Sequence, residues 1–313
     1  MPRSSSPRFP PGVIIPLGIL AVSTASVLIR YAQQEASSLT IAASRLILAV
    51  VLLTPYVALR HRREFSTLTG PDLRLALLSG VMLAVHFGAW ISSLEYTSVA
   101  SSVVLVSTTP LWVAVSAPLL LNEELSREIL GGMGVALLGG VLVVAADAEG
   151  IPAANPGSSP WGGLSSRGPL WGDLLAVIGA VSGAAYLMIG RHLREKFSLT
   201  VYVFLVYGMA AAILGAAMIM VDGLPTGFSG RIYLWFVLLA LGPQLLGHTI
   251  FNWALRYLPS SLVSITLLGE PVGSTVLAAA LLGERPSLLK IFGAILILLG
   301  IMSASSKKNR QAD

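Results

Sequence analysis

Residues 94–139 read LEYTSVASSVVLVSTTPLWVAVSAPLLLNEELSREILGGMGVALLG, and residues 255–300 read LRYLPSSLVSITLLGEPVGSTVLAAALLGERPSLLKIFGAILILLG. The two stretches align without a gap at an offset of 161, and 13 of the 46 positions are identical. Matches between aliphatic residues mean little in an apolar chain, but matches between Tyr, Pro, Glu, Ser and Gly residues at one offset mean more. These are Tyr96/Tyr257, Pro110/Pro271, Glu123/Glu284, Ser126/Ser287, Gly132/Gly293 and Gly139/Gly300. The chain is therefore read as two copies of one unit.

The composition of the 313-residue chain is typical of a membrane protein. Hydrophobic residues make up 55% of the chain and charged residues only 11%, and the mean hydropathy is +0.80. So few charged groups cannot cover a water-soluble fold of this size, which excludes ordinary soluble and disordered proteins. The sequence has no cysteine, which excludes disulfides, thiolate metal sites and cysteine nucleophiles.

Apolar segments recur along the chain at almost even spacing. Each is too long for a strand, and backbone in lipid must satisfy its own hydrogen bonds, so we expect each segment to be a helix. The expected spans are 13–31, 39–59, 73–94, 99–121, 128–146, 169–190, 199–221, 231–254, 260–282 and 287–304. The predicted fold is an all-α membrane protein with ten transmembrane helices.

Each copy of the repeat holds five of these helices. Because five is odd, the second copy enters the membrane from the opposite side, which gives two inverted-topology five-helix repeats of the kind found in many secondary transporters. A stretch rich in Pro, Gly and Ser separates them. The expected parts are a tail at 1–12, a first repeat at 13–146, an extracytoplasmic linker at 147–168, a second repeat at 169–304 and a tail at 305–313.

The distribution of basic residues predicts the orientation. If the N-terminus is cytoplasmic, the cytoplasmic ends hold 14 of the 20 Lys and Arg residues, the opposite ends hold 5, and Arg45 lies within a span. The cytoplasmic set is Arg3, Arg8, Arg60, Arg62, Arg63, Arg74, Arg127, Arg191, Arg194, Lys196, Arg256, Lys307, Lys308 and Arg310. This bias places both termini in the cytoplasm. Because the basic residues are scattered over short loops, nucleic acid is not expected as a partner.

The repeated stretches resemble the EamA branch of the drug/metabolite transporter superfamily. In each copy the pattern runs from a Tyr through small residues to a mid-segment Pro, an acidic turn and a Gly-spaced last helix, and Arg45 in ASRLILA resembles an arginine usual in the family's second helix. The resemblance covers nearly the whole chain. It implies a multi-pass permease of the plasma (inner) membrane, often an exporter of amino acids, metabolites or drugs. It also implies that the first four helices of each half line a central cavity.

Charged side chains at membrane depth are costly, so each one is a candidate for function. Glu270 precedes Pro271 in the ninth expected span, on one helical stripe with Thr266 and Ser274. It is either a proton-coupling group or a structural carboxylate. Arg45 binds Glu270, a substrate carboxylate, or backbone carbonyls of other helices.

Two histidines occupy similar places in the two halves. His86 lies one helical turn before Trp90 in the third span, and His248 lies in the eighth at an offset of 162. Gln244, His248 and Asn252 follow each other at i, i+4 and i+8, which predicts a polar stripe. This stripe either lines the substrate pathway or forms hydrogen bonds between helices. Histidine can carry protons between pH 5 and 8, so both histidines are proton-coupling candidates.

Aromatic residues and prolines complete the candidate set. Trp112 and Tyr186, with Tyr202 and Tyr207, are able to stack on a flat or cationic substrate, although such residues more often pack against neighbours. Pro110 and Pro271 each remove an intrahelical hydrogen bond, so we expect helix breaks or hinges there.

Together these features predict a secondary transporter, working by alternating access on a small-molecule substrate within the lipid bilayer, with protons as a candidate coupling ion. No phosphate loop, metal-ligand cluster or Ser/His/Asp set occurs at credible spacing, so we expect no enzyme activity, cofactor or metal. A nucleotide-sugar or organic-phosphate exchanger of the same superfamily is an alternative, but it would need several cations in the cavity. A membrane-embedded enzyme or receptor would need a catalytic set or an appended domain.

Overall fold

The computed structural model describes residues 9–96, 102, 105–121, 126–148, 168–282 and 287–305. Most of the predicted linker at 147–168, most of both predicted tails, and the acidic turns at Glu123 and Glu284 lie outside these residues. All regular structure in the described ranges is helical, as predicted. The helices are α1 (Pro11–Ala32), α2 (Ser38–Arg60), η1 (Glu64–Thr67), α3 (Gly70–Tyr96), α5 (Thr109–Leu120), α6 (Arg127–Ala148), α7 (Gly168–Arg194), α8 (Leu199–Val221), α9 (Gly230–Leu239), η3 (Ala240–His248), α10 (Thr249–Ala254), α11 (Ser260–Thr266), α12 (Gly269–Leu282) and α13 (Leu288–Ser305).

Six helices in the described ranges are long and apolar enough to cross a membrane. They are α1, α2, α3, most of α7, α8, and the continuous run from α9 through η3 to α10. The two predicted segments that contain Pro110 and Pro271 are shorter or divided: α5 has 12 residues, and the segment 260–282 is split into α11 and α12. Six spans are thus supported directly, and the count of ten stays a prediction.

Both prolines lie at helix beginnings rather than inside continuous helices. A turn at residues 107–108 precedes α5, where Pro110 occupies the first turn, and a turn at residues 267–268 precedes α12, where Pro271 does the same. The first turn of a helix tolerates proline because its N–H groups have no intrahelical partner. The chain therefore breaks between two helical pieces at matching places in the two halves, which is one of the two outcomes expected at these prolines.

The eighth predicted span contains a π-helical stretch. Nine residues from Ala240 to His248 form η3, which includes Pro243. A π-helix has more residues per turn than an α-helix, so the i, i+4, i+8 spacing expected for Gln244, His248 and Asn252 does not give one straight stripe. Gln244 and Asn252 are nevertheless both fully buried, and His248 is half-buried. The three residues therefore do not form the straight stripe that was predicted, although Gln244 and Asn252 do face the interior.

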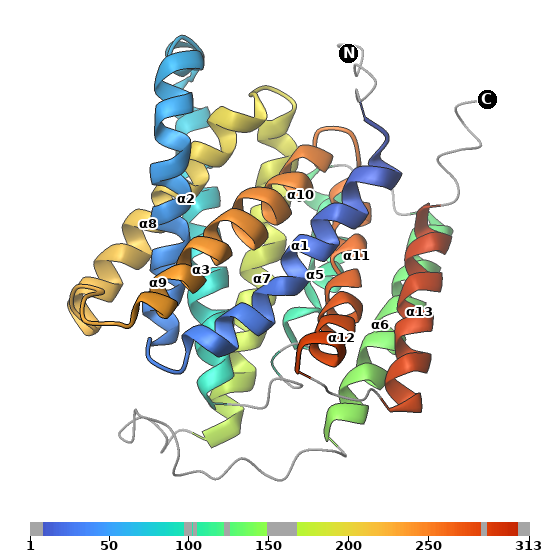
Figure 1. Cartoon of the computed structure of the whole chain (residues 1–313). Helices are drawn as coiled ribbons and strands as arrows, with labels where there is room; N and C mark the ends of the chain where they lie inside the picture. The colour runs from blue at the N-terminus through green and yellow to red at the C-terminus, as the bar shows by residue number, and fades with distance from the viewer. Residues whose placement is uncertain are drawn as a thin grey trace.

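Helix packing follows a pseudo-twofold exchange of the two halves. The first helix of the first half, α1, contacts the third helical run of the second half (α9, η3 and α10), and α7 contacts α3 in the same way. Likewise α1 packs on α12 as α7 packs on α5, while α2 packs on its counterpart α8. The beginning of α1 and the end of α13 lie at the same end of the bundle (Figure 1). These pairings agree with an inverted repeat.

Glycines at repeat-matched positions make the closest of these contacts. A Cβ atom on Gly132 would lie 2.5 Å from the carbonyl oxygen of Gly300, and one on Gly139 would lie 2.5 Å from that of Gly293. Because Gly132 matches Gly293 and Gly139 matches Gly300 in the repeat, α6 and α13 present the same surface to each other. The two helices therefore cross as an isologous pair around the pseudo-twofold axis, and in Figure 1 they lie together at one edge of the bundle.

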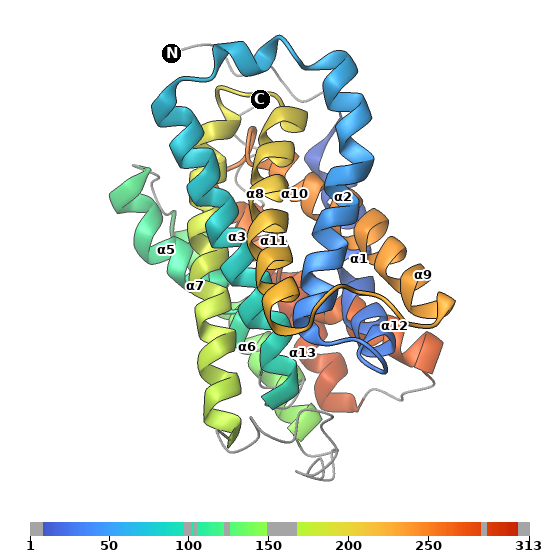
Figure 2. The ribbon, with the colours of Figure 1, turned by 90° about the vertical axis from the view of Figure 1, so that its left-hand side faces the viewer.

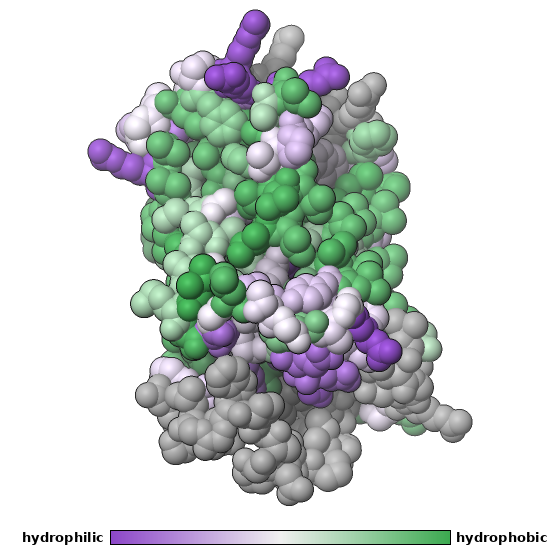
Figure 3. All heavy atoms as spheres, turned by 60° about the vertical axis from the view of Figure 1, so that its left-hand side comes forward, coloured by the Kyte–Doolittle hydropathy of each residue, from purple (hydrophilic) through white to green (hydrophobic). Residues whose placement is uncertain are grey.

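The surface agrees with a lipid environment. Figure 3 shows hydrophobic residues over much of the middle of one face and hydrophilic residues mainly toward its ends. Large aliphatic side chains such as Leu59, Leu119 and Met220 are more than four-fifths exposed. An apolar belt of this kind is unfavourable in water and favourable in hydrocarbon.

Candidate functional site

Arg45 lies inside the bundle without hydrogen-bond partners. It is carried by α2, whose N-cap Ser37 accepts a hydrogen bond from the Thr40 N–H and fixes the start of the helix. The side chain is 0% exposed, and Nε, Nη1 and Nη2 have no hydrogen-bond partner among the described residues. Its Cζ atom lies 4.2 Å from the centroid of the Phe87 ring. A desolvated cation supported by one aromatic face is incompletely compensated.

Glu270 is the acidic group that interacts electrostatically with Arg45. It lies in the first turn of α12, next to α1: Ser23 Oγ donates to the Glu270 carbonyl at 3.2 Å. The two side chains do not come close enough to form an ion pair. Of the options for Arg45, neither direct pairing with Glu270 nor bonding to carbonyls is found in the described part of the chain.

The helical stripe expected around Glu270 is interrupted. Thr266 ends α11 and donates to the Val263 carbonyl at 2.7 Å, whereas Glu270 and Ser274 belong to α12 beyond the break. Ser274 Oγ donates to the Ser23 carbonyl at 3.2 Å. The three residues therefore do not share one helix face, because the chain leaves α-helical geometry at residues 267–268.

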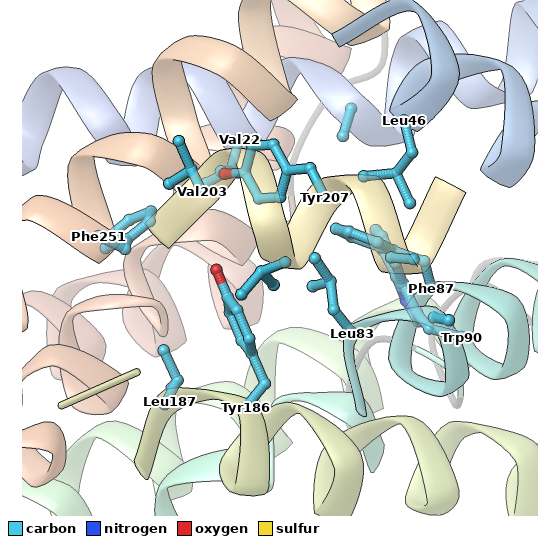
Figure 4. Packing of buried hydrophobic residues seen from close by; sticks show 14 of the residues in the cluster. Val22, Leu46, Leu83, Phe87, Trp90, Tyr186, Leu187, Val203, Tyr207 and Phe251 are labelled. Atoms are coloured by element: carbon cyan, nitrogen blue, oxygen red, sulfur yellow. The ribbon is translucent and has the colours of Figure 1, made fainter. Parts of the chain in front are cut away.

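Phe87 lies at the centre of an aromatic group that joins the two halves. His86 and His248 both lie against it, at centroid distances of 5.0 Å, the latter in an edge-to-face arrangement. Trp90 stacks on His86 at 6.2 Å with an interplanar angle of 22°. Figure 4 shows Phe87 and Trp90 side by side on the same helix. The structure thus brings together the two histidines that the sequence placed at similar positions in the repeat.

A polar chain of tyrosines and amides adjoins this group. The Tyr186 hydroxyl donates to Asn252 Oδ1 at 2.7 Å, and Asn252 Nδ2 donates to the Tyr207 hydroxyl at 3.3 Å. Tyr207 in turn donates to the Gln244 carbonyl at 3.4 Å. In Figure 4 the two tyrosines approach each other from opposite sides of the buried cluster. Asn252 is therefore satisfied by helix-to-helix bonding, the second of the two roles expected for the polar stripe.

Two further buried polar groups lack partners. Among the residues that the structure describes, neither side-chain amide atom of Gln244, which is 0% exposed, makes a hydrogen bond, and neither does Nε1 of Trp90, which is 7% exposed. Buried polar atoms in native proteins are nearly always satisfied, so each exception calls for an explanation such as water or ligand.

Trp112 lies apart from this group. It is 40% exposed on α5, and its Nε1 donates to Thr108 Oγ1 at 3.2 Å. No contact joins it to Arg45 or Phe87 among the described residues, so it is not included in the site proposed below.

Hydrogen bonds between the halves close one end of the bundle. The Ser198 N–H donates to Glu64 Oε1 at 2.6 Å, and His61 Nδ1 lies 3.2 Å from Glu64 Oε2. Beside them, Lys196 donates to Asp72 at 2.9 Å. Burial raises the pKa of the Glu64 carboxyl, but the bonds from Ser198 and His61 outweigh burial and lower it below the ordinary value. We call these contacts the Glu64 latch; the segment between α2 and α3 that carries it runs over the top of the bundle in Figure 2.

A related set of bonds joins the halves near the other ends of α2 and α8. Ser37 and Thr40 both donate to the Asp222 carboxylate, the latter at 2.9 Å. The Ser229 N–H and Oγ donate to Glu35 at 2.9 and 2.8 Å and hold the pKa of that carboxyl below its usual range. Ser37 and Ser198 are repeat-matched N-caps, and each is held by an acid that follows a helix of the other half. We call this second set the Asp222 latch.

The comparisons with known proteins identify the family. The EamA-like transporter family matches residues 12–145 and 170–306, which are the two predicted repeats. The chain belongs to the EamA-like transporter family. It is thus a multi-pass membrane transporter of the drug/metabolite superfamily, as the resemblance in the repeated stretches implied. Its family and the names of its relatives indicate a transporter rather than an enzyme. Among the described residues, no group of three His, Asp or Glu side chains is placed to hold a metal ion.

Curated relatives are named only as uncharacterized transporters. One, YyaM of Bacillus subtilis, is 24% identical over 219 residues, which cover 68% of this chain and 66% of that protein. Another, from Archaeoglobus fulgidus, is 22% identical over 310 residues, covering 95% of this chain and 98% of the relative. A solved crystal structure aligns with 97% of this chain and 99% of its own at a TM-score of 0.76 and 18% identity, which shows a shared fold.

Sequence reasoning missed Phe87 and both latches. Phe87 was one apolar residue among many, and only its position beneath Arg45 distinguishes it. The latches join residues 134 and 185 positions apart, and hydrophobic periodicity carries no signal for such pairs. The acid-rich and Ser-rich helix ends were visible in the sequence, as was the match of Ser37 with Ser198 at the repeat offset.

Proposed function

We propose that the protein is a secondary transporter with ten transmembrane helices, which carries a small molecule through the interface between its two halves by alternating access. The observation that carries this proposal is a buried Arg45 that has no hydrogen-bond partner among the described residues. It lies over Phe87, which His248 of the other half contacts, and it interacts electrostatically with Glu270. Intramembrane charge at a repeat interface is the usual place of a transporter site. The excess of basic residues at one set of helix ends supports cytoplasmic termini and an inner-membrane location.

The two latches supply the gates in this proposal. Each joins a helix end of one half to an acidic residue of the other, and the two N-caps, Ser37 and Ser198, match at the repeat offset although the acids do not. Opening the Glu64 latch would admit solute from the end predicted to be cytoplasmic, and opening the Asp222 latch would admit it from the opposite end. Because the two sets of bonds are similar in kind, the two inward- and outward-open states would differ little in free energy, as alternating access requires.

Coupling to protons is proposed to involve Glu270, His86 and His248. Both histidine rings contact the Phe87 ring, and Arg45 interacts electrostatically with both and with Glu270. Proton binding at any of the three would change the charge that Arg45 experiences and thereby its affinity for solute. An exporter is the direction we propose, with proton entry driving solute exit.

The second candidate, a nucleotide-sugar or organic-phosphate exchanger, is less well supported. Such a substrate calls for several unpaired cations. Arg194 is the other deeply buried arginine among the described residues, and it already donates to the carbonyls of Asn252 and Phe197.

Flux into or out of proteoliposomes tests the proposal. Purified protein is reconstituted, loaded with a panel of radiolabelled amino acids, organic acids, amines and sugars, and assayed with and without an inwardly directed proton gradient. We expect at least one solute to leave the proteoliposomes faster than it leaves protein-free vesicles loaded with the same solute. This efflux should be faster with the proton gradient and should be abolished in His248→Ala or Arg45→Gln. Flux of no solute under either condition would contradict transport, and flux that is indifferent to pH would contradict proton coupling alone.

A further inference from the structure

Three buried polar groups that lack hydrogen-bond partners among the described residues come from separate elements: Arg45 from α2, Trp90 from α3 and Gln244 from η3. Arg45 on α2 places its guanidinium over the Phe87 ring, and Trp90 lies one turn further along the helix of Phe87. Gln244 lies in η3, which also carries His248 against the edge of Phe87. The described residues leave these groups with one cation, two neutral N–H donors and one amide oxygen unsatisfied.

The other deeply buried arginine shows that this fold can satisfy such a side chain. Arg194, 2% exposed, donates from Nε to the Asn252 carbonyl at 3.1 Å and from Nη1 to the Phe197 carbonyl. Arg45 is buried at least as deeply and has no such bond. A structural arginine would be held as Arg194 is held, so the guanidinium of Arg45, bare among the described residues, points to a partner beyond them.

The chemistry of these groups selects an anion with two oxygens. The planar fork of a guanidinium matches a carboxylate in bidentate geometry, and the Gln244 amide and Trp90 indole add neutral N–H donors. Arg45 would repel a cationic solute, and Glu270 is the one acidic group among the described residues that acts electrostatically on this position. The rings of His86, Phe87 and Trp90 supply an apolar wall for the remainder of the solute.

We propose that the transported solute is a small organic carboxylate, whose carboxylate binds Arg45 with Gln244 and Trp90 as further donors. This inference rests on the proposed transport function and names the substrate class of the same site. Glu270 repels a second negative charge, which favours monocarboxylates over dicarboxylates. A protonated amine on the solute is not required.

Binding to the purified protein tests the class without relying on flux. Acetate, lactate, benzoate and glycine are compared with their methyl esters and with ethylamine and benzylamine, reading the apparent melting temperature, which rises when a ligand binds the native fold. We expect at least one carboxylate to raise it, with its methyl ester at least ~10-fold weaker, because the ester lacks the charge that Arg45 binds. If esters or amines act as strongly as carboxylates, or if no carboxylate acts at all, the proposal fails.

Two arginine series separate recognition from folding. Arg45→Gln is expected to weaken the active carboxylate by at least ~10-fold, and Arg45→Lys by less, since Lys keeps the charge and loses the fork. Arg194→Gln, the matched control, is expected to lower the melting temperature without ligand while leaving the selectivity for acid over ester unchanged. Unchanged binding in both Arg45 variants would overturn the assignment; if Arg45→Gln does not fold, Arg45→Lys still decides.

The flux panel distinguishes failure of this inference from failure of the function. Carboxylate binding that depends on Arg45, combined with flux of no solute, would support the site and contradict transport. Flux of an amine or sugar without carboxylate binding would support transport and contradict the class proposed here.

Discussion

The Glu64 latch makes a quantitative prediction for the opening of one end of the bundle. In Glu64→Gln, the charge-assisted bond from Ser198 N–H at 2.6 Å becomes a bond between neutral groups. Bonds to charged groups contribute about 1.5–3 kcal/mol and neutral ones about 0.5–1.5 kcal/mol, a loss of about 1 kcal/mol or slightly more. The Glu64 side chain is 25% exposed, so solvent screening keeps the loss of free energy holding the latch closed to about 1 kcal/mol. The population open at this end should rise about fivefold.

A single cysteine reports that population, because the native sequence has none. Ala76 lies one helical turn beyond Asp72 on α3 and is 3% exposed, so Ala76→Cys is protected while the latch is closed. We expect a membrane-impermeant maleimide, applied at the predicted cytoplasmic side, to label this cysteine about five times faster when Glu64→Gln is added. The rate rises because labelling requires the open state.

The control and the refuting result follow from the same surface. Glu195, directly after α7, forms an ion pair with Arg191 at 3.2 Å and is 58% exposed. Glu195→Gln should therefore leave the Ala76→Cys labelling rate within about twofold. An unchanged rate in Glu64→Gln, or an equal increase in both variants, would refute the idea that Glu64 holds this end closed.

Three further predictions concern the Asp222 latch, the contact between α6 and α13, and the pH dependence of the Glu64 latch. A disulfide in the double variant Ser37→Cys and Asp222→Cys should stop flux, and a reductant should restore it; flux by the fully oxidised protein would remove the Asp222 latch from the gating scheme. Gly300→Leu should lower the melting temperature, because even its Cβ would lie 2.5 Å from a carbonyl oxygen of α6, at a cost of about 1–3 kcal/mol or more, whereas Gly134→Ala, which meets nothing within 4 Å, should not. In a His61→Gln background, which removes the imidazole 3.2 Å from Glu64, the ratio of the Glu64→Gln to Glu64 labelling rates should stay constant between pH 6 and 8 and fall toward one only in more acidic solution. The Glu64 pKa is lowered in the closed state, so the carboxylate stabilises the latch at any pH above its ordinary pKa of about 4.3. It loses that effect as the pH falls through the lowered value. A ratio that changes between pH 6 and 8 would assign the effect to another group.

The repeat is the part of the fold that the sequence predicts most firmly. Gly132 matches Gly293 and Gly139 matches Gly300 at the offset of 161. In the structure Gly132 contacts Gly300, and Gly139 contacts Gly293, so each matched pair contacts the other pair. This was predictable because closely packed helices need small residues where their backbones approach, and repeated glycines are visible in the sequence. Another such pair, Gly18 and Gly179, also lies at this offset, and each makes a close contact with a helix of the other half.

Local backbone geometry and side-chain direction were less predictable. A proline reports a missing N–H, but not whether the chain bends or breaks, and at Pro110 and Pro271 it breaks. The π-helical turns around Pro243 also altered a stripe that was counted with α-helical spacing. Trp112 was grouped with the pathway by residue type alone, and only packing shows that it faces outward.

The interior of the bundle combines two requirements that conflict in an ordinary membrane protein core. Asn252, Tyr186 and Tyr207 satisfy one another across helices of the second half, which stabilises the fold. Arg45 and Gln244, on elements that contact each other, have no side-chain hydrogen bond among the described residues, which costs free energy. In a static bundle, apolar residues of similar volume would avoid that cost. Under the proposed transport function the cost has a use, because a solute that arrives at an unsatisfied group between the two halves is stabilised by it.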